Sequence, residues 1–246
     1  MDNCSGYCKK CDVVHSLGEG NSRKYALELI ERLEAEKRID FEVPIEESSP
    51  DYSTDCLFGE FRGQMFGVLE CENEEGETVI LKAYSCQHNG IWNCDGWVPP
   101  LVDTEVYQRV MEPSEKAIKA LCKKIDVLEK SDPNRKPLVE KRKSISQNLM
   151  KELFELYSFT NFCGETVSVQ EAFYRDKGIP TGTGDCCAPK LLNYAALNNL
   201  KPLGISEFYF GIETKSGSRK HGEFYPSCDI KCEPILGFML CGLEEL

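Results

Sequence analysis

Two groups of cysteines constrain this 246-residue chain more than any other feature. The first group, Cys4-x3-Cys8-x2-Cys11, stands at the start of the sequence and is followed by His15. Three thiols and an imidazole this close together are the donor set of a tetrahedral Zn²⁺ site. Such a site would staple a short segment that lacks a hydrophobic core of its own. We therefore predict that residues 1–41 form a metal-binding segment followed by a helix.

The same three cysteines also have the spacing of the [4Fe–4S] ligands in radical enzymes that use S-adenosylmethionine. A cluster held by three thiolates keeps one iron free for the cofactor. Here the motif begins at residue 4, which leaves no room for the barrel strand that precedes it in those enzymes. Zinc is the first prediction for this site, and an iron–sulfur cluster is the alternative.

The second group lies in the C-terminal third of the chain. Cys186 precedes an apolar run with helical spacing, and Cys228 and Cys232 are four residues apart, which is one turn of a helix. A helix start stabilises a thiolate, which favours metal binding or nucleophilic use. We predict a zinc site made by these three cysteines. His221 is the fourth ligand if the site is closed, and Glu223 is the proton shuttle if one position stays open for water.

Two other interpretations of the second group stay open. In the first, Cys186 is a nucleophile and His221 its base, as in papain-like and transglutaminase-like hydrolases. That interpretation gives Cys228 and Cys232 no role. In the second, the cysteines are inert core residues, since free cysteine is among the most buried residue types.

Composition narrows the compartment and the partners. The chain has 29 Lys+Arg against 41 Asp+Glu, a formal net charge of −12, which argues against indiscriminate nucleic-acid binding. No run approaches 18 consecutive apolar residues, so we predict no membrane span. The N-terminal residues have neither a basic start nor an apolar stretch, and 14 cysteines without an export signal suit a reducing compartment. We expect a cytoplasmic protein.

Residues 113–158 contain the strongest helical pattern. Two apolar stripes with helical spacing flank the turn signal at residues 131–134, which predicts a helical hairpin. Residues 116–151 hold 11 basic and 4 acidic residues, a net charge of 11 − 4 = +7. This charge is either a solvated helix face or an arm that contacts RNA phosphates.

The remaining segments complete an α+β prediction. Apolar runs at Cys56–Phe61, Met65–Cys71 and Val79–Tyr84 are separated by glycine-containing turns, which predicts an antiparallel meander within residues 55–112. Residues 159–246 alternate helical and strand patterns and form a C-terminal α/β unit that carries the second cysteine group.

The second cysteine group resembles the metal-binding motifs of zinc nucleoside and nucleic-acid deaminases. A cysteine stands at one helix start, and Pro226-x-Cys228-x3-Cys232 precedes the next helix. In those enzymes zinc activates water while a glutamate carries the proton. The resemblance implies a deaminase-like C-terminal unit and a hydrolytic reaction, with three spacer residues here where the family has two.

A second resemblance covers roughly residues 55–241. Gly67-Val-Leu, Trp97-Val-Pro-Pro, Thr183-Gly-Asp-Cys-Cys-Ala-Pro-Lys-Leu-Leu and His221-Gly-Glu-Phe-Tyr-Pro-Ser-Cys are similar to an accessory region that precedes the catalytic domain of some bacterial RluA-type pseudouridine synthases. The synthase's own Arg-Leu-Asp motif does not occur in this chain. The resemblance implies a role in RNA modification, with a pseudouridine synthase as partner. The alternative function is a non-catalytic module that binds RNA or protein.

Overall fold

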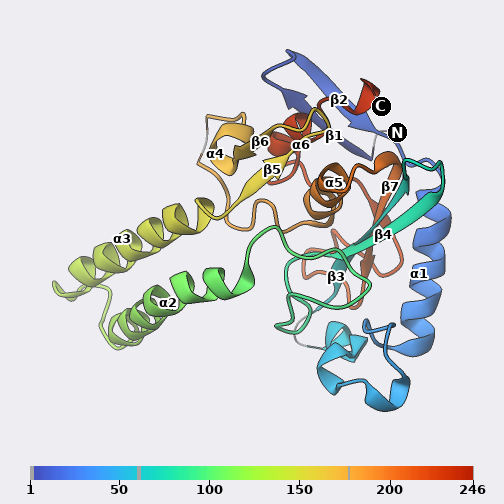
Figure 1. Ribbon diagram of the computed structural model, residues 1–246. Helices are drawn as coiled ribbons and strands as arrows, with labels where there is room; N and C mark the ends of the chain where they lie inside the picture. Colours follow the sequence, from blue (N-terminus) through green and yellow to red (C-terminus); the bar gives the residue numbers. More distant parts are fainter. Residues whose placement is uncertain (1–2, 60–61, 177, 246) are drawn as a thin grey trace. The chain divides into compact units, whose positions relative to one another are not determined.

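The computed structural model describes residues 3–59, 62–176 and 178–245. They form two compact units: residues 102–158 make one, and the residues up to Leu101 together with those from Phe159 onward make the other. Helices and antiparallel sheets both occur, so the predicted α+β class is confirmed (Figure 1). None of the described helices has the length and apolar character needed to cross a membrane.

The larger unit is built on a four-stranded antiparallel sheet with strand order β4-β3-β7-β8. Its strands are β3 (Gln64–Glu72), β4 (Thr78–Tyr84), β7 (Lys201–Phe210) and β8 (Phe224–Tyr225). The strands predicted from the apolar runs near residues 65–71 and 79–84 are therefore present. The neighbour of β3 on its other side is β7, which comes from more than 120 residues further along the chain.

One helix covers each face of this sheet (Figure 1). Side chains alternate between the faces of a strand. Helix α1 (Ser22–Glu36) packs on the face that carries Phe66 and Phe208. Helix α5 (Cys187–Leu197) packs on the opposite face, where a Cβ at Gly67 would lie 2.6 Å from the Cβ of Cys187. Glycine at position 67 is therefore what allows α5 to approach the sheet.

The first predicted strand of the meander is wrong. Thr54–Phe58 form a short 3₁₀ helix, η3, and Glu60 and Phe61 lie outside the described residues. The reason is local, because the Ser53 hydroxyl accepts the backbone N–H of Asp55 at 3.1 Å and starts a turn. Two more 3₁₀ helices, η1 (Ile45–Glu47) and η2 (Pro50–Tyr52), lie between α1 and η3.

The chain ends meet around helix α6 (Glu233–Met239). Strands β1 (Cys4–Cys8) and β2 (Val13–Leu17) form an antiparallel hairpin, and β1 packs against α6. Three short elements precede α5 in the chain: β5 (Ser158–Thr160), β6 (Thr166–Ser168) and helix α4 (Val169–Ala172). Helix α4 starts with a capping box. A last 3₁₀ turn, η4 (Leu243–Glu245), follows α6.

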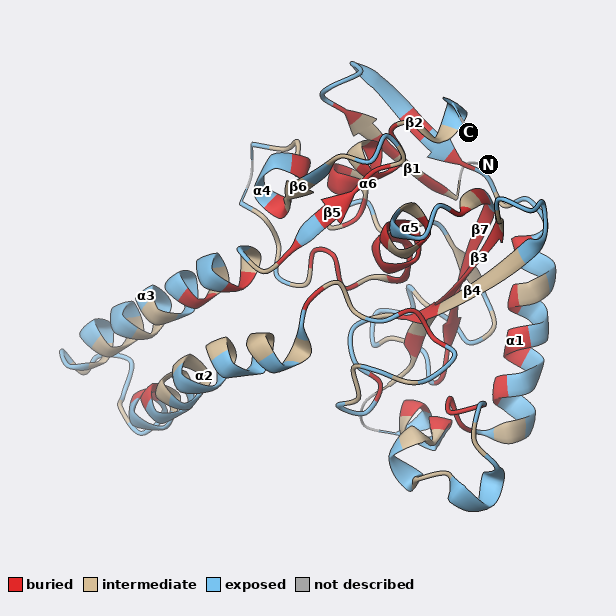
Figure 2. Ribbon diagram, in the orientation of Figure 1, coloured by how far each residue is buried: buried red, intermediate tan, exposed pale blue. Residues whose placement is uncertain are grey.

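The smaller unit is the predicted helical hairpin. Its helices are α2 (Thr104–Asp126) and α3 (Arg135–Phe154), which pack through Leu121, Leu149 and Leu153. Helix α2 begins nine residues before the predicted boundary at 113, because Asp103 caps its first turn by accepting two backbone N–H groups. Figure 2 shows that most of this unit's surface is exposed or half-buried.

Candidate metal centres

The structure brings four donor side chains together at the first site. Sulfur atoms of Cys8, Cys11 and Cys241 and one ring nitrogen of His15 all lie within 4.8 Å of one another. The Cys8 and Cys11 sulfurs are 3.7 Å apart, and the Cys11 and Cys241 sulfurs are 3.1 Å apart. Thiolates on a tetrahedral zinc at about 2.3 Å are separated by roughly 3.8 Å. The cluster could therefore hold a metal ion with only small side-chain movements.

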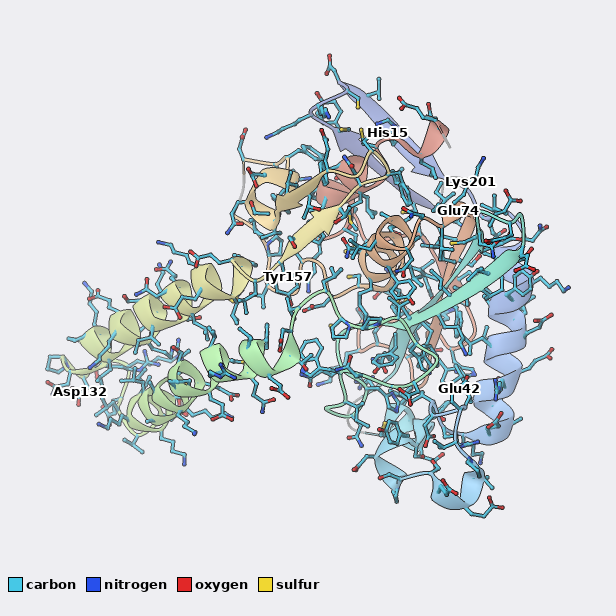
Figure 3. The ribbon with its side chains drawn as sticks, viewed as in Figure 1. His15, Glu42, Glu74, Asp132, Tyr157 and Lys201 are labelled. Carbon is cyan, nitrogen blue, oxygen red and sulfur yellow. The ribbon has the colours of Figure 1, made fainter. Side chains whose placement is uncertain are left out.

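The histidine at this site has an unused ring nitrogen. His15 lies on β2 (labelled in Figure 3) and is 9% exposed, and its Nε2 is buried with no hydrogen-bond partner among the described residues. A buried polar atom without a partner is costly, and in native proteins such atoms usually have one. Bonding to a metal would satisfy it. The donor set of three sulfurs and one imidazole is the one that structural zinc prefers.

A tight turn and a close contact between two backbone segments create this cluster. The β1–β2 turn closes through Asp12, which has a φ of 57° and donates its N–H to the carbonyl of Cys8 at 2.9 Å. Next to it, a Cβ at Gly6 would lie 2.3 Å from the backbone nitrogen of Gly237. The hairpin and α6 therefore touch backbone to backbone, and this contact brings Cys241 to the turn.

Cys4 does not belong to this cluster, so the predicted ligand set is corrected at that position. In strand β1 the side chains of Cys4 and Cys8 are on the same buried face. Four residues of extended chain separate them by about 13 Å, too far to share one ion. Cys4 is instead near Glu207, and burial raises the pKa of its thiol to about 12. The sequence spacing predicts that Cys4 and Cys8 share one metal ion, whereas the strand between them keeps them apart.

The second site collects the three predicted cysteines. The sulfurs of Cys186, Cys228 and Cys232 all lie within 4.8 Å of one another. Cys186 is the residue before α5 and Cys232 the residue before α6. The N–H of Cys232 donates to the carbonyl of Cys228 at 3.2 Å, so one helical turn keeps these two on the same side. This cluster could also hold a metal ion.

The thiols of the second site share their protons. Hydrogen bonds with Cys186 and Cys232 hold the pKa of Cys228 far below its ordinary range. The hydrogen bond with Cys228 and burial raise the pKa of Cys186. Hydrogen bonds with Cys186 and Cys228, together with burial, raise the pKa of Cys232. The backbone N–H of Lys231 also donates to the Cys228 sulfur at 3.3 Å. The hydrogen bonds within the cluster therefore favour the thiolate form of Cys228, which is the form that binds a cation.

Two buried charged residues surround the second site, and sequence reasoning did not select either. Glu207 accepts the Ala188 N–H at 2.7 Å, and burial raises the pKa of its carboxyl to about 7. Its charge also contributes to the raised pKa of Cys186. Lys190 is 2% exposed and donates to the carbonyl of Tyr84 at 2.7 Å, and burial lowers its pKa. A charged residue inside the apolar run at 203–212 was the signal that could have pointed to Glu207.

His221 is not brought to the second site, because the central sheet separates them. His221 packs against Phe210 with ring centroids 4.7 Å apart, on the face covered by α1. Its Nδ1 accepts the N–H of Gly211 at 3.0 Å, and its Nε2 lies 3.2 Å from Glu34. Cys186 starts the helix on the opposite face. The structure therefore supports neither His221 as a ligand nor a Cys186–His221 nucleophile pair.

Glu223 is likewise placed elsewhere. Its carboxylate is exposed and accepts the hydroxyl of Tyr225 at 2.9 Å. Within the described residues, neither Glu223 nor His221 joins a metal-binding group. The proton-carrying role predicted for Glu223 is therefore corrected on geometric grounds.

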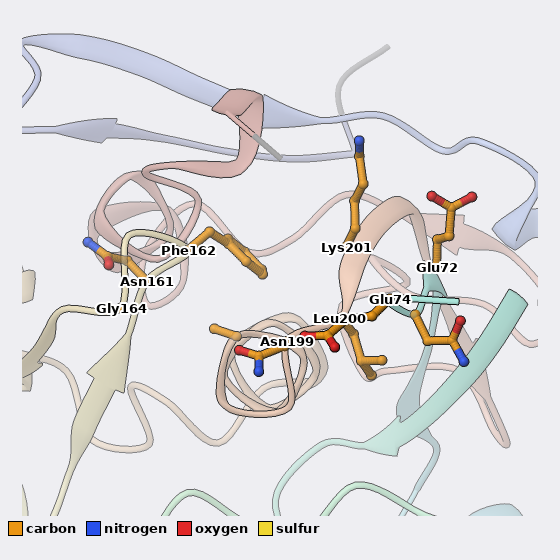
Figure 4. Close-up of a pocket in the computed structure, with 10 residues that line it drawn as sticks. Glu72, Glu74, Asn161, Phe162, Gly164, Asn199, Leu200 and Lys201 are labelled. Atoms are coloured by element: carbon orange, nitrogen blue, oxygen red, sulfur yellow. The ribbon is translucent and has the colours of Figure 1, made fainter. Parts of the chain in front are cut away.

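The pocket shown in Figure 4 borders the first cluster, because Phe162 in its lining donates its N–H to the carbonyl of Cys241 at 3.0 Å. It has a volume of about 500 Å³ and lies between three turns that contribute Asn161, Phe162, Leu200 and Lys201, among others. Asn161 uses its side chain to hold its own turn, accepting the N–H groups of Cys163 and Glu165. Its lining includes none of the cysteines of either cluster.

Comparisons with protein-family models, curated proteins and solved structures found no match for this chain.

Proposed function

We propose that this chain is a zinc protein with one closed, structural site and one open site that has the features of a hydrolytic centre. The observation that supports this division is the number of donors. Among the described residues, Cys8, Cys11, His15 and Cys241 supply four donors to the first cluster, whereas the second cluster has three. Structural zinc sites have four protein ligands, and catalytic sites have three and keep a position for water or substrate.

Glu207 takes the proton-carrying role at the open site in this proposal. Zinc lowers the pKa of a bound water to about 7, and a carboxylate in reach can accept its proton. The carboxyl of Glu207 is anchored by the first turn of α5, which also follows the ligand Cys186. A rigidly placed carboxylate beside a three-thiolate site is a reasonable arrangement for metal-assisted hydrolysis.

Metal content tests the first half of the proposal. We expect two zinc ions per wild-type chain, and one per chain in both Cys241→Ser and Cys228→Ser. Cys122→Ser is the matched control, since Cys122 lies in the hairpin outside both clusters, and should retain two. A folded wild-type protein without zinc after anaerobic purification would falsify the metal proposal.

Cobalt substitution tests the open position. Cobalt–thiolate absorption reports the coordination of each site. Cys241→Ser removes a ligand of the first site, so its spectrum reports the second site. Cys228→Ser removes a ligand of the second site, so its spectrum reports the first. Azide should change the spectrum of cobalt-loaded Cys241→Ser and leave that of Cys228→Ser unchanged. If azide changes neither spectrum, both sites are closed and the hydrolytic assignment fails while zinc binding stands.

We also infer that the setting is RNA modification, with RNA bound by the basic hairpin. The supporting observations are the resemblance described above and the net charge of +7 over residues 116–151. In the hairpin, ion pairs join Lys116 to Glu112 and Lys119 to Glu115. The basic residues beyond these two pairs are therefore the candidates for phosphate contacts. A non-catalytic binding module remains the second candidate function on this observation.

Charge reversal tests the RNA proposal. We would change four hairpin residues to glutamate: Lys123, Lys124, Lys141 and Arg142. The matched control reverses four exposed lysines of the other unit: Lys9, Lys24, Lys37 and Lys215. The parent should bind RNA with an affinity that falls steeply with salt, and only the hairpin variant should lose it. No detectable RNA affinity at low salt would remove this proposal, and direct binding of an RluA-type synthase tests the partner.

A further inference from the structure

The first metal site contains a pair of thiols from opposite ends of the chain. The sulfurs of Cys11 and Cys241 are 3.1 Å apart although 230 residues separate them in sequence. A disulfide has a sulfur–sulfur distance of about 2.05 Å, so an approach of about 1 Å joins them. Cys11 is exposed on the β1–β2 turn, whereas Cys241 is 3% exposed. One thiol of the pair is thus open to a reagent in solution and the other is held directly behind it.

We propose that Cys11 and Cys241 are an oxidation site, which a hydroperoxide such as hydrogen peroxide converts to a disulfide with loss of the metal from the first site. The release of metal rests on the proposed function, because it requires that zinc binds there. The formation of the disulfide does not depend on it, since it needs only the two thiols and their placement.

The chemistry has two steps. The Cys11 thiol gives up its proton and the thiolate attacks one peroxide oxygen. The O–O bond breaks, Cys11 becomes a sulfenic acid, and the leaving hydroxide takes up that proton and departs as water. The Cys241 thiol then attacks the sulfenic sulfur, the S–O bond breaks, and a second water leaves. The two thiols lose two electrons and two protons in total, and one peroxide is reduced to two waters.

Geometry favours Cys241 over the other neighbouring thiols as the partner of Cys11. The Cys8 sulfur is 3.7 Å from that of Cys11, which is longer by 0.6 Å than the distance to Cys241. Cys163 is also exposed and packs nearby, with its sulfur 2.6 Å from where a Cβ on Gly242 would stand. Cys163 is therefore a neighbour of Cys241, and its thiol is the competing partner for a disulfide with Cys11.

Oxidation would replace one link between the chain ends by another. The metal loses two of its four ligands and leaves, because a disulfide sulfur is no longer a thiolate donor. The new covalent bond still holds the β1–β2 turn beside the end of α6. We therefore expect oxidised protein without zinc to be more stable than reduced protein without zinc.

The experiment treats zinc-loaded and metal-free wild-type protein with one equivalent of hydrogen peroxide. Peptide mapping without reductant should find Cys11 linked to Cys241 in both, and the loaded protein should release one zinc per disulfide formed. Cys241→Ser should lose the crosslink. Cys163→Ser is the matched control and should keep both the crosslink and the zinc release.

The outcomes separate this proposal from the proposed function. A Cys11–Cys241 crosslink in a protein that never contained zinc supports the oxidation site and contradicts the metal proposal. The opposite outcome is a protein that binds two zinc ions but whose metal-free form still has a reduced Cys11 after peroxide treatment. That outcome overturns the oxidation site and leaves the metal proposal standing. A crosslink from Cys11 to Cys8 or Cys163 also overturns it.

Discussion

The two cysteine clusters differ in where their donors come from. The first joins the N-terminal hairpin to a cysteine beyond the last helix, across 241 − 15 = 226 residues. The second uses the starts of two neighbouring helices, across 228 − 186 = 42 residues. The first has four donors and the second has three. The comparison indicates that one site holds the chain ends together, while the other is placed on the packed core beside buried charged groups.

Both clusters depend on the same helix. Cys232 precedes α6 and Cys241 follows it, so α6 carries one ligand of each site. The helix is held by its contact with β1. At Gly6 and Gly237 no side chain separates the two backbones. The clearest ways to test the comparison are therefore changes that affect one cluster and spare the other.

The largest effect is expected from Gly237→Ala. The added Cβ would lie 2.2 Å from the carbonyl of Tyr7, so β1 and α6 must separate. We expect a loss of stability of about 3 kcal/mol or more, as for severe overpacking, with zinc lost from the first site. Denaturant unfolding and metal content measure both. Gly18→Ala is the control, since a Cβ there meets nothing within 4 Å, and an equal loss in this variant would contradict the argument.

The next effect concerns pH and belongs to the second cluster alone. The pKa of Glu207 is raised to about 7 by burial, so the folded protein binds this proton more tightly than the unfolded chain. The stability that this carboxyl contributes is therefore fully present below about pH 4.5 and is lost as the pH rises through 7. Glu207→Gln should raise the free energy of unfolding by up to ~3 kcal/mol at pH 8 in the presence of a chelator. The same substitution should have little effect at pH 4.5.

A smaller difference is expected between ligand substitutions at the two sites. Closing a loop costs more entropy when the loop is longer, so a link across 226 residues constrains the unfolded chain more than one across 42. With zinc present, Cys241→Ser should destabilise the protein more than Cys228→Ser by about 1.5 kcal/mol on this entropy alone. Denaturant unfolding at equal free zinc measures the difference, and the reverse order would contradict the assignment of the structural site.

The smallest effect is expected at the surface next to the first cluster. Lys10 forms an ion pair with Glu165, and both side chains are exposed. Exposed ion pairs contribute little, so Lys10→Ala should leave stability and zinc content unchanged within error. Loss of zinc from this variant would show that the turn is held by charge rather than by the metal and the backbone contact.

Local patterns predicted much of the fold. Helical periodicity located α1, and strand-type apolar runs located β3 and β4, because these elements each bury one face against the same core. Local signals failed where a neighbouring side chain sets the backbone conformation, as at the 3₁₀ helix Thr54–Phe58. They also missed the first turns of α2, which begins at Thr104, nine residues before the predicted start of the hairpin.

The candidate sites were predictable only in part. The spacing of Cys8, Cys11 and His15 and of Cys228 and Cys232 follows from short segments, so the sequence alone indicated these groups. It could not identify Cys241, which has no partner at short spacing. It also could not show that a strand holds Cys4 apart from Cys8, or that the central sheet separates His221 from Cys186.

What the sequence by itself determined was the presence of two thiol-rich groups, a basic hairpin and an α+β core. The tertiary structure alone decided how many donors each site has. The physical reason is that a fourth ligand supplied from the far end of the chain depends on packing rather than spacing. Cys241 reaches the N-terminal turn because two glycines let a strand and a helix touch, and that contact makes the first site closed while the second has three donors.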